Sequence, residues 1–250
     1  MGTSGYRGNC VDRRREGLDV KRSDRGWLAQ LCRIGTTLGL LAVSACAETH
    51  GRSWSSYFGD HRLTEKWGVH FDGQYRRDLN EDWNQSLLRP GVNYYVRPNL
   101  FLTQGYAWIR TGSGSTVSTE HRGWQQVQYM PKALGVVMSH RFRLEQRWIM
   151  LNVGHRYQNR FRYFYRTEIP ATSKYFVGLQ NEVFLGFGQN HGAAVYDQNR
   201  AYVSVGKRFG AIGRIEVGYM YQNLLQRNGV TREHNHIAVV SFLSAKSWAR

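Results

Sequence analysis

The sequence predicts an all-β fold, an antiparallel transmembrane β-barrel of about ten strands, with twelve as the alternative count. The first observation is the stretch Ser139–Arg166, in which arginines alternate with aromatic residues along two long runs. Successive side chains of a strand point to opposite faces, so each run has an arginine face and an aromatic face. A soluble core cannot hold so many charges, whereas a barrel with a polar lumen and a lipid-facing exterior accepts both faces.

The second and third observations are strand length and composition. The alternating runs exceed the roughly 5–6 residues usual in soluble sheets and match the ~9–11 residues that cross a bilayer when tilted. Aromatic residues make up 14% and charged residues 21% of the 250 residues, which suits long strands and excludes a helical membrane bundle. The formal net charge of +16 is spread along the chain rather than clustered, so nucleic-acid binding is not expected.

The N-terminal segment has the order of a secretory signal: basic residues, an apolar run that ends at Cys46, and small residues. We predict that residues 1–47 are a cleaved signal peptide, in which Met1–Asp19 is a non-native or untranslated extension. Ala45-Cys46-Ala47 forms a cleavage site, and the alternative is a lipobox that leaves a lipidated Cys46. Residues 48–250 are then a single barrel domain without cysteine, so we expect no disulfide or cysteine-based metal site in it.

From residue 51 onward, segments with a period of two follow one another with only turn residues between them, as in sandwiches and barrels. The ten predicted strands are Trp67–Arg77, Leu87–Arg97, Leu100–Arg110, Glu120–Met130, two within Ser139–Arg166 on either side of a break at Met150–Asn152, Lys174–Phe187, Asp197–Phe209, Ile212–Gln226 and Glu233–Leu243. The short run Trp54–Asp60 is left out because bacterial barrels usually have an even number of strands. Twelve strands would follow if this run pairs and one more strand exists.

The even number also fixes which connections share an end of the barrel. Short turns are expected on the periplasmic side and longer loops outside. The predicted periplasmic turns are Pro98-Asn99, Pro131-Lys132 and Gly210-Ala211. The predicted outer loops are Gly112–Thr119, Gln189–Tyr196 and Arg227–Arg232.

Several short motifs recur in a recognisable order along the strands. They are Arg89-Pro90-Gly91-Val92-Asn93-Tyr94, His121-Arg122 with Gln125-Gln126, Arg141-x-Arg143-x-Glu145-x-Arg147, Asn181-Glu182 and Gln198-Asn199-Arg200. Together they resemble domain-of-unknown-function family 2490 through most of residues 54–243. The resemblance implies an outer-membrane-type barrel of a Gram-negative bacterium, with no assigned activity and no catalytic residues.

The charged residues on the lumen-facing side of the strands are the candidate functional residues. They are Arg89, Arg122, Arg141, Arg143, Glu145, Arg147, Arg156, Arg160, Arg162, Glu182, Arg200, Arg214 and Glu216. On one hypothesis they form a structural ladder of cross-strand pairs that fills a narrow barrel. On the other they line a narrow passage that favours anions. Since ten arginines and three glutamates cannot pair one to one, we predict a basic interior that holds water or a small anion nearest to Arg141, Arg143, Arg147, Arg160 and Arg162.

Two other functions are alternatives. An outer-membrane lipid-modifying enzyme would need a nucleophile and a base, for which the chain offers Ser139 and the histidines His140, His155, His191, His234 and His236. No nucleophile-elbow, zinc-protease or phosphate-loop motif accompanies them, so we assign no catalytic residue, metal or cofactor. A soluble lipid-binding β-barrel is the second alternative. We expect the outer membrane as the location, with outer-membrane lipid, the barrel assembly machinery and small anions as partners.

Overall fold

The computed structural model describes residues 47–250, except 134, 189–190, 193, 211 and 248–250. These residues belong to one compact unit, Ser44–Arg250. The predicted signal peptide, apart from its last residue Ala47, and the predicted lipidation of Cys46 lie outside the described residues. Among the residues described, no helix is long and apolar enough to cross a membrane.

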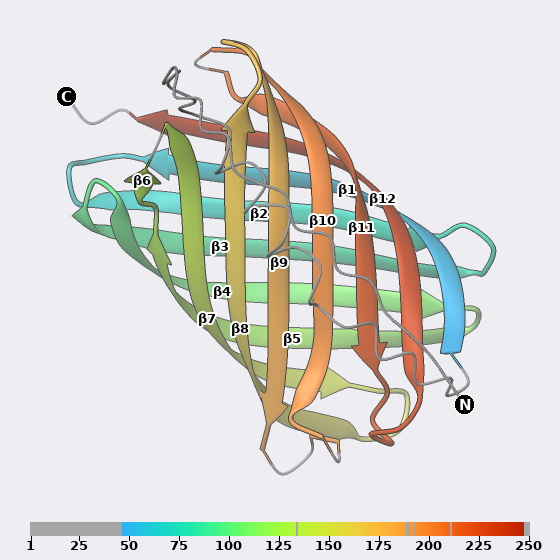
Figure 1. Ribbon diagram of the computed structural model, residues 1–250. Helices are drawn as coiled ribbons and strands as arrows, with labels where there is room; N and C mark the ends of the chain where they lie inside the picture. The colour runs from blue at the N-terminus through green and yellow to red at the C-terminus, as the bar shows by residue number, and fades with distance from the viewer. Residues whose placement is uncertain (1–46, 134, 189–190, 193, 211, 248–250) are drawn as a thin grey trace, which may run out of the picture. The chain divides into compact units, whose positions relative to one another are not determined.

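The unit consists of β-strands that alternate in direction along most of the chain (Figure 1). Their bounds are β1 Ala47–Arg62, β2 Trp67–Asp78, β3 Trp83–Arg97, β4 Leu100–Ser113, β5 Thr116–Tyr129, β6 Lys132–Ala133, β7 Val136–Met150, β8 His155–Pro170, β9 Tyr175–Phe187, β10 Tyr196–Arg208, β11 Arg214–Leu225 and β12 Arg232–Ser247. Each of the long strands pairs antiparallel with the next, and β5 pairs with β7 past the two-residue β6.

The sheet closes into a barrel because β1 pairs with β12 (Figure 1). This pairing is parallel and runs from Ala47 opposite Arg232 to Arg62 opposite Ser247. The predicted β-barrel is therefore confirmed, with eleven long strands, a number between the ten and the twelve expected. The expectation of an even number is wrong: Trp54–Asp60, which we left out, lies inside the sixteen-residue β1. With an odd number of long strands, the first and the last run in the same direction.

The barrel therefore has two rims that differ in the chain end they carry. We call the rim where β1 begins the N-terminal rim and the rim where β12 ends the C-terminal rim. The three predicted short turns lie in the β3–β4, β5–β7 and β10–β11 connections, at the C-terminal rim. The three predicted loops lie in connections at the N-terminal rim, but Gly112–Thr119 is wrong as a loop. Strands β4 and β5 extend to a tight turn, in which Gly114 has a φ of 56° that favours glycine.

The two faces of the sheet differ sharply in chemistry, as β7 illustrates. Arg143 and Glu145 point into the barrel and are 1% and 0% exposed. Their neighbours Phe142 and Leu144 point outward and are 43% and 38% exposed. Phe161 and Tyr163 of β8 lie on the outward face with them, since Phe161 is the cross-strand partner of Leu144 and Tyr163 that of Phe142.

The interior also contains apolar clusters, which the sequence analysis did not anticipate. One consists of Trp54, Tyr202, Met220, Ile237 and Val239, from β1 and β10–β12. Another joins Leu87, Ala107, Ile109 and Trp124, from β3–β5. A side chain at Gly91 or Gly105 would meet the Trp124 ring, so glycine at these two positions lets the indole lie flat against the wall. The inner face is thus part apolar and part charged.

Candidate functional site in the barrel interior

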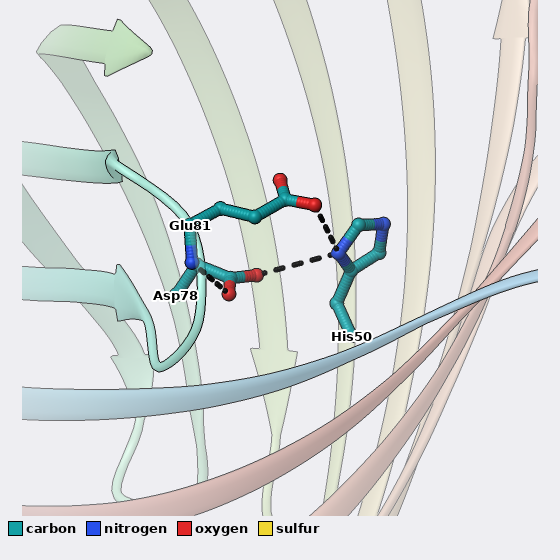
Figure 2. Close-up of side chains that lie close together, drawn as sticks. All are labelled: His50, Asp78 and Glu81. Carbon is teal, nitrogen blue, oxygen red and sulfur yellow. Dashed lines mark hydrogen bonds and ion pairs between the residues drawn. The ribbon is translucent and has the colours of Figure 1, made fainter. Parts of the chain in front are cut away.

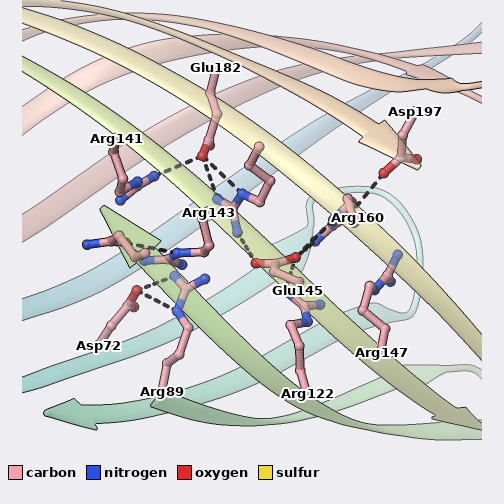
Figure 3. Close-up of polar contacts among 12 residues, drawn as sticks. Asp72, Arg89, Arg122, Arg141, Arg143, Glu145, Arg147, Arg160, Glu182 and Asp197 are labelled. Carbon is pink, nitrogen blue, oxygen red and sulfur yellow. Dashed lines mark hydrogen bonds and ion pairs between the residues drawn. The ribbon is translucent and has the colours of Figure 1, made fainter. Parts of the chain in front are cut away.

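Acidic and basic side chains from neighbouring strands meet inside the barrel (Figure 3). The centre of this ion-pair network is Glu145 of β7, which is fully buried. Its carboxylate accepts hydrogen bonds from Arg122 Nη1 at 3.2 Å, Arg160 Nη2 at 2.8 Å and Arg162 Nη1 at 2.6 Å. Arg160 lies directly opposite Glu145 in the β7–β8 register, so the pairing of the strands brings the two together.

A second carboxylate, Glu182 of β9, extends the network. Arg162 donates to Glu182 from Nε at 3.1 Å and from Nη2 at 2.7 Å, and Arg141 Nη2 donates at 2.8 Å. Arg162 therefore bridges Glu145 and Glu182. Charge-assisted bonds with two contacts fix both distance and orientation, so these side chains hold one another in place.

Four carboxylates that the sequence analysis did not single out complete the pairing. Glu120 binds Arg122 and Arg147, Asp72 binds Arg89, and Asp197 binds Arg160. Glu168 binds Arg166, Arg208 and Arg214. Two of these acids could have been found from the sequence. Asp72 is two positions from Gln74, and Glu120 is two positions from Arg122, so the members of each pair point to the same face of their strand. They reduce the excess of positive charge that ten arginines and three glutamates alone imply.

Eleven of the thirteen candidate residues take part in ion pairs. These eleven are Arg89, Arg122, Arg141, Glu145, Arg147, Arg160, Arg162, Glu182, Arg200, Arg214 and Glu216. The other two, Arg143 and Arg156, have no ion pair within 4 Å among the described residues. Arg143 instead donates to Gln126 Oε1, from Nε at 2.9 Å, and lies 4.3 Å from the centre of the Trp124 ring.

A cavity of about 660 Å³ lies between the network and the C-terminal rim. Ten arginine and lysine side chains line it, against three carboxylates. At the rim it reaches Pro98, Met130 and Lys246. Trp54, Tyr202, Met220 and Val239, four members of the first apolar cluster, form part of its wall. The cavity therefore combines an excess of positive charge with an apolar surface.

At the N-terminal rim, His50, Asp78 and Glu81 lie close enough to hold a metal ion, with one ligand atom of each within 4.8 Å of the others (Figure 2). Both oxygens of Asp78 are already engaged, however. Oδ1 accepts from the backbone N–H groups of Asn80 at 2.9 Å and Glu81 at 3.1 Å, and Oδ2 accepts from Arg52 Nε at 3.3 Å. The cluster is best understood as a capped turn tied to β1 by an ion pair.

The residues considered for an enzyme are placed apart. Ser139 accepts a hydrogen bond from Gln128 inside the barrel, whereas the next residue, His140, contacts Tyr163 on the outward face. His234 and His236 also lie outward, where their Nδ1 atoms face the hydroxyls of Tyr221 and Tyr219. His191, in the β9–β10 connection, lies 2.8 Å from the carbonyl of Ala194. His155 is exposed at the start of β8.

Comparisons with known proteins agree with this picture of a barrel without an assigned activity. A family described as "Protein of unknown function (DUF2490)" matches residues 51–233. An uncharacterised protein of Methylorubrum extorquens is 29% identical over 158 residues, which cover 60% of this chain and 69% of that protein. No solved structure matches the chain. The resemblance seen in the sequence motifs is confirmed.

Proposed function

The chain belongs to this family of unknown function, DUF2490, and we propose that it is a bacterial outer-membrane β-barrel without catalytic activity whose interior is closed by its own side chains. Its partners in this proposal are outer-membrane lipid and the machinery that assembles barrels. The charged residues of the interior act first as a structural ladder, and nucleic acid is not a partner.

The observation that carries the proposed location is the outward face of the strands. Large apolar side chains are exposed along most of the barrel wall, among them Phe71, Val92, Leu102, Phe142, Leu144, Leu179, Val203, Val217 and Val240. Soluble monomers rarely expose contiguous apolar surface of this extent. The long strands have 12–16 residues, more than the ~9–11 that cross a bilayer when tilted. A lipid-facing wall accounts for both features.

The ion-pair network supports a closed interior. Glu145, Arg162 and Glu182 are almost fully excluded from solvent, and the Arg162 guanidinium is held by both carboxylates. Eight-stranded barrels are just filled by side chains, and eleven strands widen the interior only moderately. Long arginine side chains and the apolar clusters occupy part of that extra width, and the cavity takes up the rest. An anion-selective passage is the second candidate function, favoured by the surplus of basic residues at the C-terminal rim.

Location can be tested by fractionating cells that express a tagged copy of the full chain. We expect the mature protein in the outer-membrane fraction, with a gel mobility that shifts on heating because closed barrels resist detergent until heated. The free soluble periplasm is the location that the soluble lipid-binding alternative predicts. Recovery there, without detergent, would refute the proposed membrane location.

The closed interior can be tested by planar-bilayer conductance of the refolded barrel in a salt gradient. We expect no reproducible conductance steps, because on this proposal the buried pairs around Glu145 close the aqueous path. Anion-selective steps that disappear in Arg143→Gln or Arg160→Gln, and persist in Arg77→Gln on the outward face, would instead establish the passage.

A further inference from the structure

The inner end of the cavity holds two arginines whose charges are poorly compensated. Arg76 of β2 has no carboxylate within 4 Å among the described residues, and it donates only to the neutral side chains of Gln74 and Gln85. Arg200 of β10 is 9% exposed, and Glu182, its one ion-pair partner among the described residues, lies 3.9 Å away. A guanidinium out of bulk water is costly unless an anion balances it.

Both arginines contact the same aromatic ring. The guanidinium carbon of Arg76 lies 4.0 Å and that of Arg200 lies 4.9 Å from the centre of the Trp54 ring. Trp54 also belongs to the apolar cluster with Tyr202, Met220 and Val239. The Trp54 ring therefore contacts two positively charged side chains and also belongs to the apolar wall of the same cavity. Such a combination recognises a molecule with an anionic group at one end and an apolar body.

We propose that the cavity at the C-terminal rim binds an organic anion, a phosphate or carboxylate joined to an apolar group. Its anionic group would lie between Arg76 and Arg200, and its apolar part along Trp54, Met220 and Val239. At about 660 Å³ the cavity is within the roughly 300–1,000 Å³ range of small-molecule sites. The proposal goes beyond a structural role for the arginines, and it does not require a passage through the barrel.

The same chemistry could come from a free metabolite or from a lipid headgroup. Phenyl phosphate represents the first source and dihexanoyl phosphatidic acid the second. Inorganic phosphate offers only the anion, and benzyl alcohol only the apolar body. Binding is measured by titration calorimetry of the refolded full-length barrel in a neutral detergent, with the heat-dependent gel shift as the check that each variant is folded.

Phenyl phosphate or the short-chain lipid should bind more tightly than inorganic phosphate or benzyl alcohol. Whichever of phenyl phosphate and the lipid binds more tightly identifies the source. Arg76→Gln and Arg200→Gln should each weaken that binding by about 10- to 100-fold, the loss expected for one charge-assisted hydrogen bond. Arg77→Gln is the matched control, because Arg77 is the next residue of β2 and is exposed on the outward face. Its affinity should equal that of the unaltered barrel.

Three results would overturn the proposal. The first is that neither organic anion binds. The second is that the Arg76→Gln, Arg200→Gln and Arg77→Gln barrels bind with equal affinity. The third is that inorganic phosphate binds as tightly as the organic anions. Should a glutamine variant fail to fold, Arg200→Lys keeps the charge but loses the planar fork and should still weaken binding. Since the barrel's folding is recorded separately, a failure of this proposal is distinguishable from a failure of the proposed membrane location.

Discussion

Replacing Glu145 with glutamine should lower the free energy of unfolding by about 3–5 kcal/mol, the cost of removing one partner from a buried ion pair. Glu145 accepts from three arginines and is fully buried. Glutamine has the same shape, but it carries no charge and turns one of its two ends into a donor. The repulsion among the positive charges of Arg122, Arg160 and Arg162 would then lack the balancing negative charge. The N–H group of the new amide would also face the N–H groups of the guanidinium side chains.

The measurement is a denaturant titration of the barrel refolded into lipid vesicles. Glu65→Gln is the control, since Glu65 is exposed in the β1–β2 connection, and its change should stay within about 0.5 kcal/mol. Combining Glu145→Gln with Arg162→Gln should recover part of the loss, because it removes one of the three positive charges that Glu145 balances. If Glu145→Gln were as mild as Glu65→Gln, the network would not be the structural ladder that we propose.

Strand periodicity was sufficient to predict the barrel and its two faces, but not the first strand. The residues before Trp54 in β1 are mostly polar and show no apolar alternation. They are held in a strand mainly by β12, which lies more than 180 residues away in the chain, since the pairing with β2 begins only at Arg52. A local pattern does not report such a pairing, and this is why ten or twelve strands were expected instead of eleven, and why the last pairing is parallel in a barrel predicted to be antiparallel.

The same limit applies to the candidate site. Alternation placed the arginines on one face, but the carboxylate that each one meets depends on the register between strands. Arg141 and Glu182 are 41 residues apart, and Arg166 and Glu216 are 50 apart. Of the five arginines expected nearest to water or an anion, four are in ion pairs, and Arg143 has none with the residues that the structure describes. Arg76, which binds no carboxylate within 4 Å in the described part of the chain, was recognised only as part of an alternating strand.

Replacing Leu144 with arginine should cost about 2–4 kcal/mol of unfolding free energy if this outward position faces the middle of the bilayer. Leu144 is 38% exposed and packs beside Phe142 and opposite Phe161 on the outward face. In water, an arginine at such a position is easily hydrated, so a soluble barrel should change by no more than about 0.5 kcal/mol. The substitution therefore separates a lipid-facing wall from a water-facing wall.

Leu63→Arg provides the matched control for this test. Leu63 is 46% exposed, so it is at least as accessible as Leu144, but it lies in the β1–β2 connection at the C-terminal rim. The cost of a charge falls to about 0–1 kcal/mol near the membrane interface. Denaturant titration in vesicles should thus give a large loss for Leu144→Arg and a small one for Leu63→Arg. Equal small losses would mean that the apolar face does not contact lipid, because depth in the bilayer is what distinguishes the two leucines.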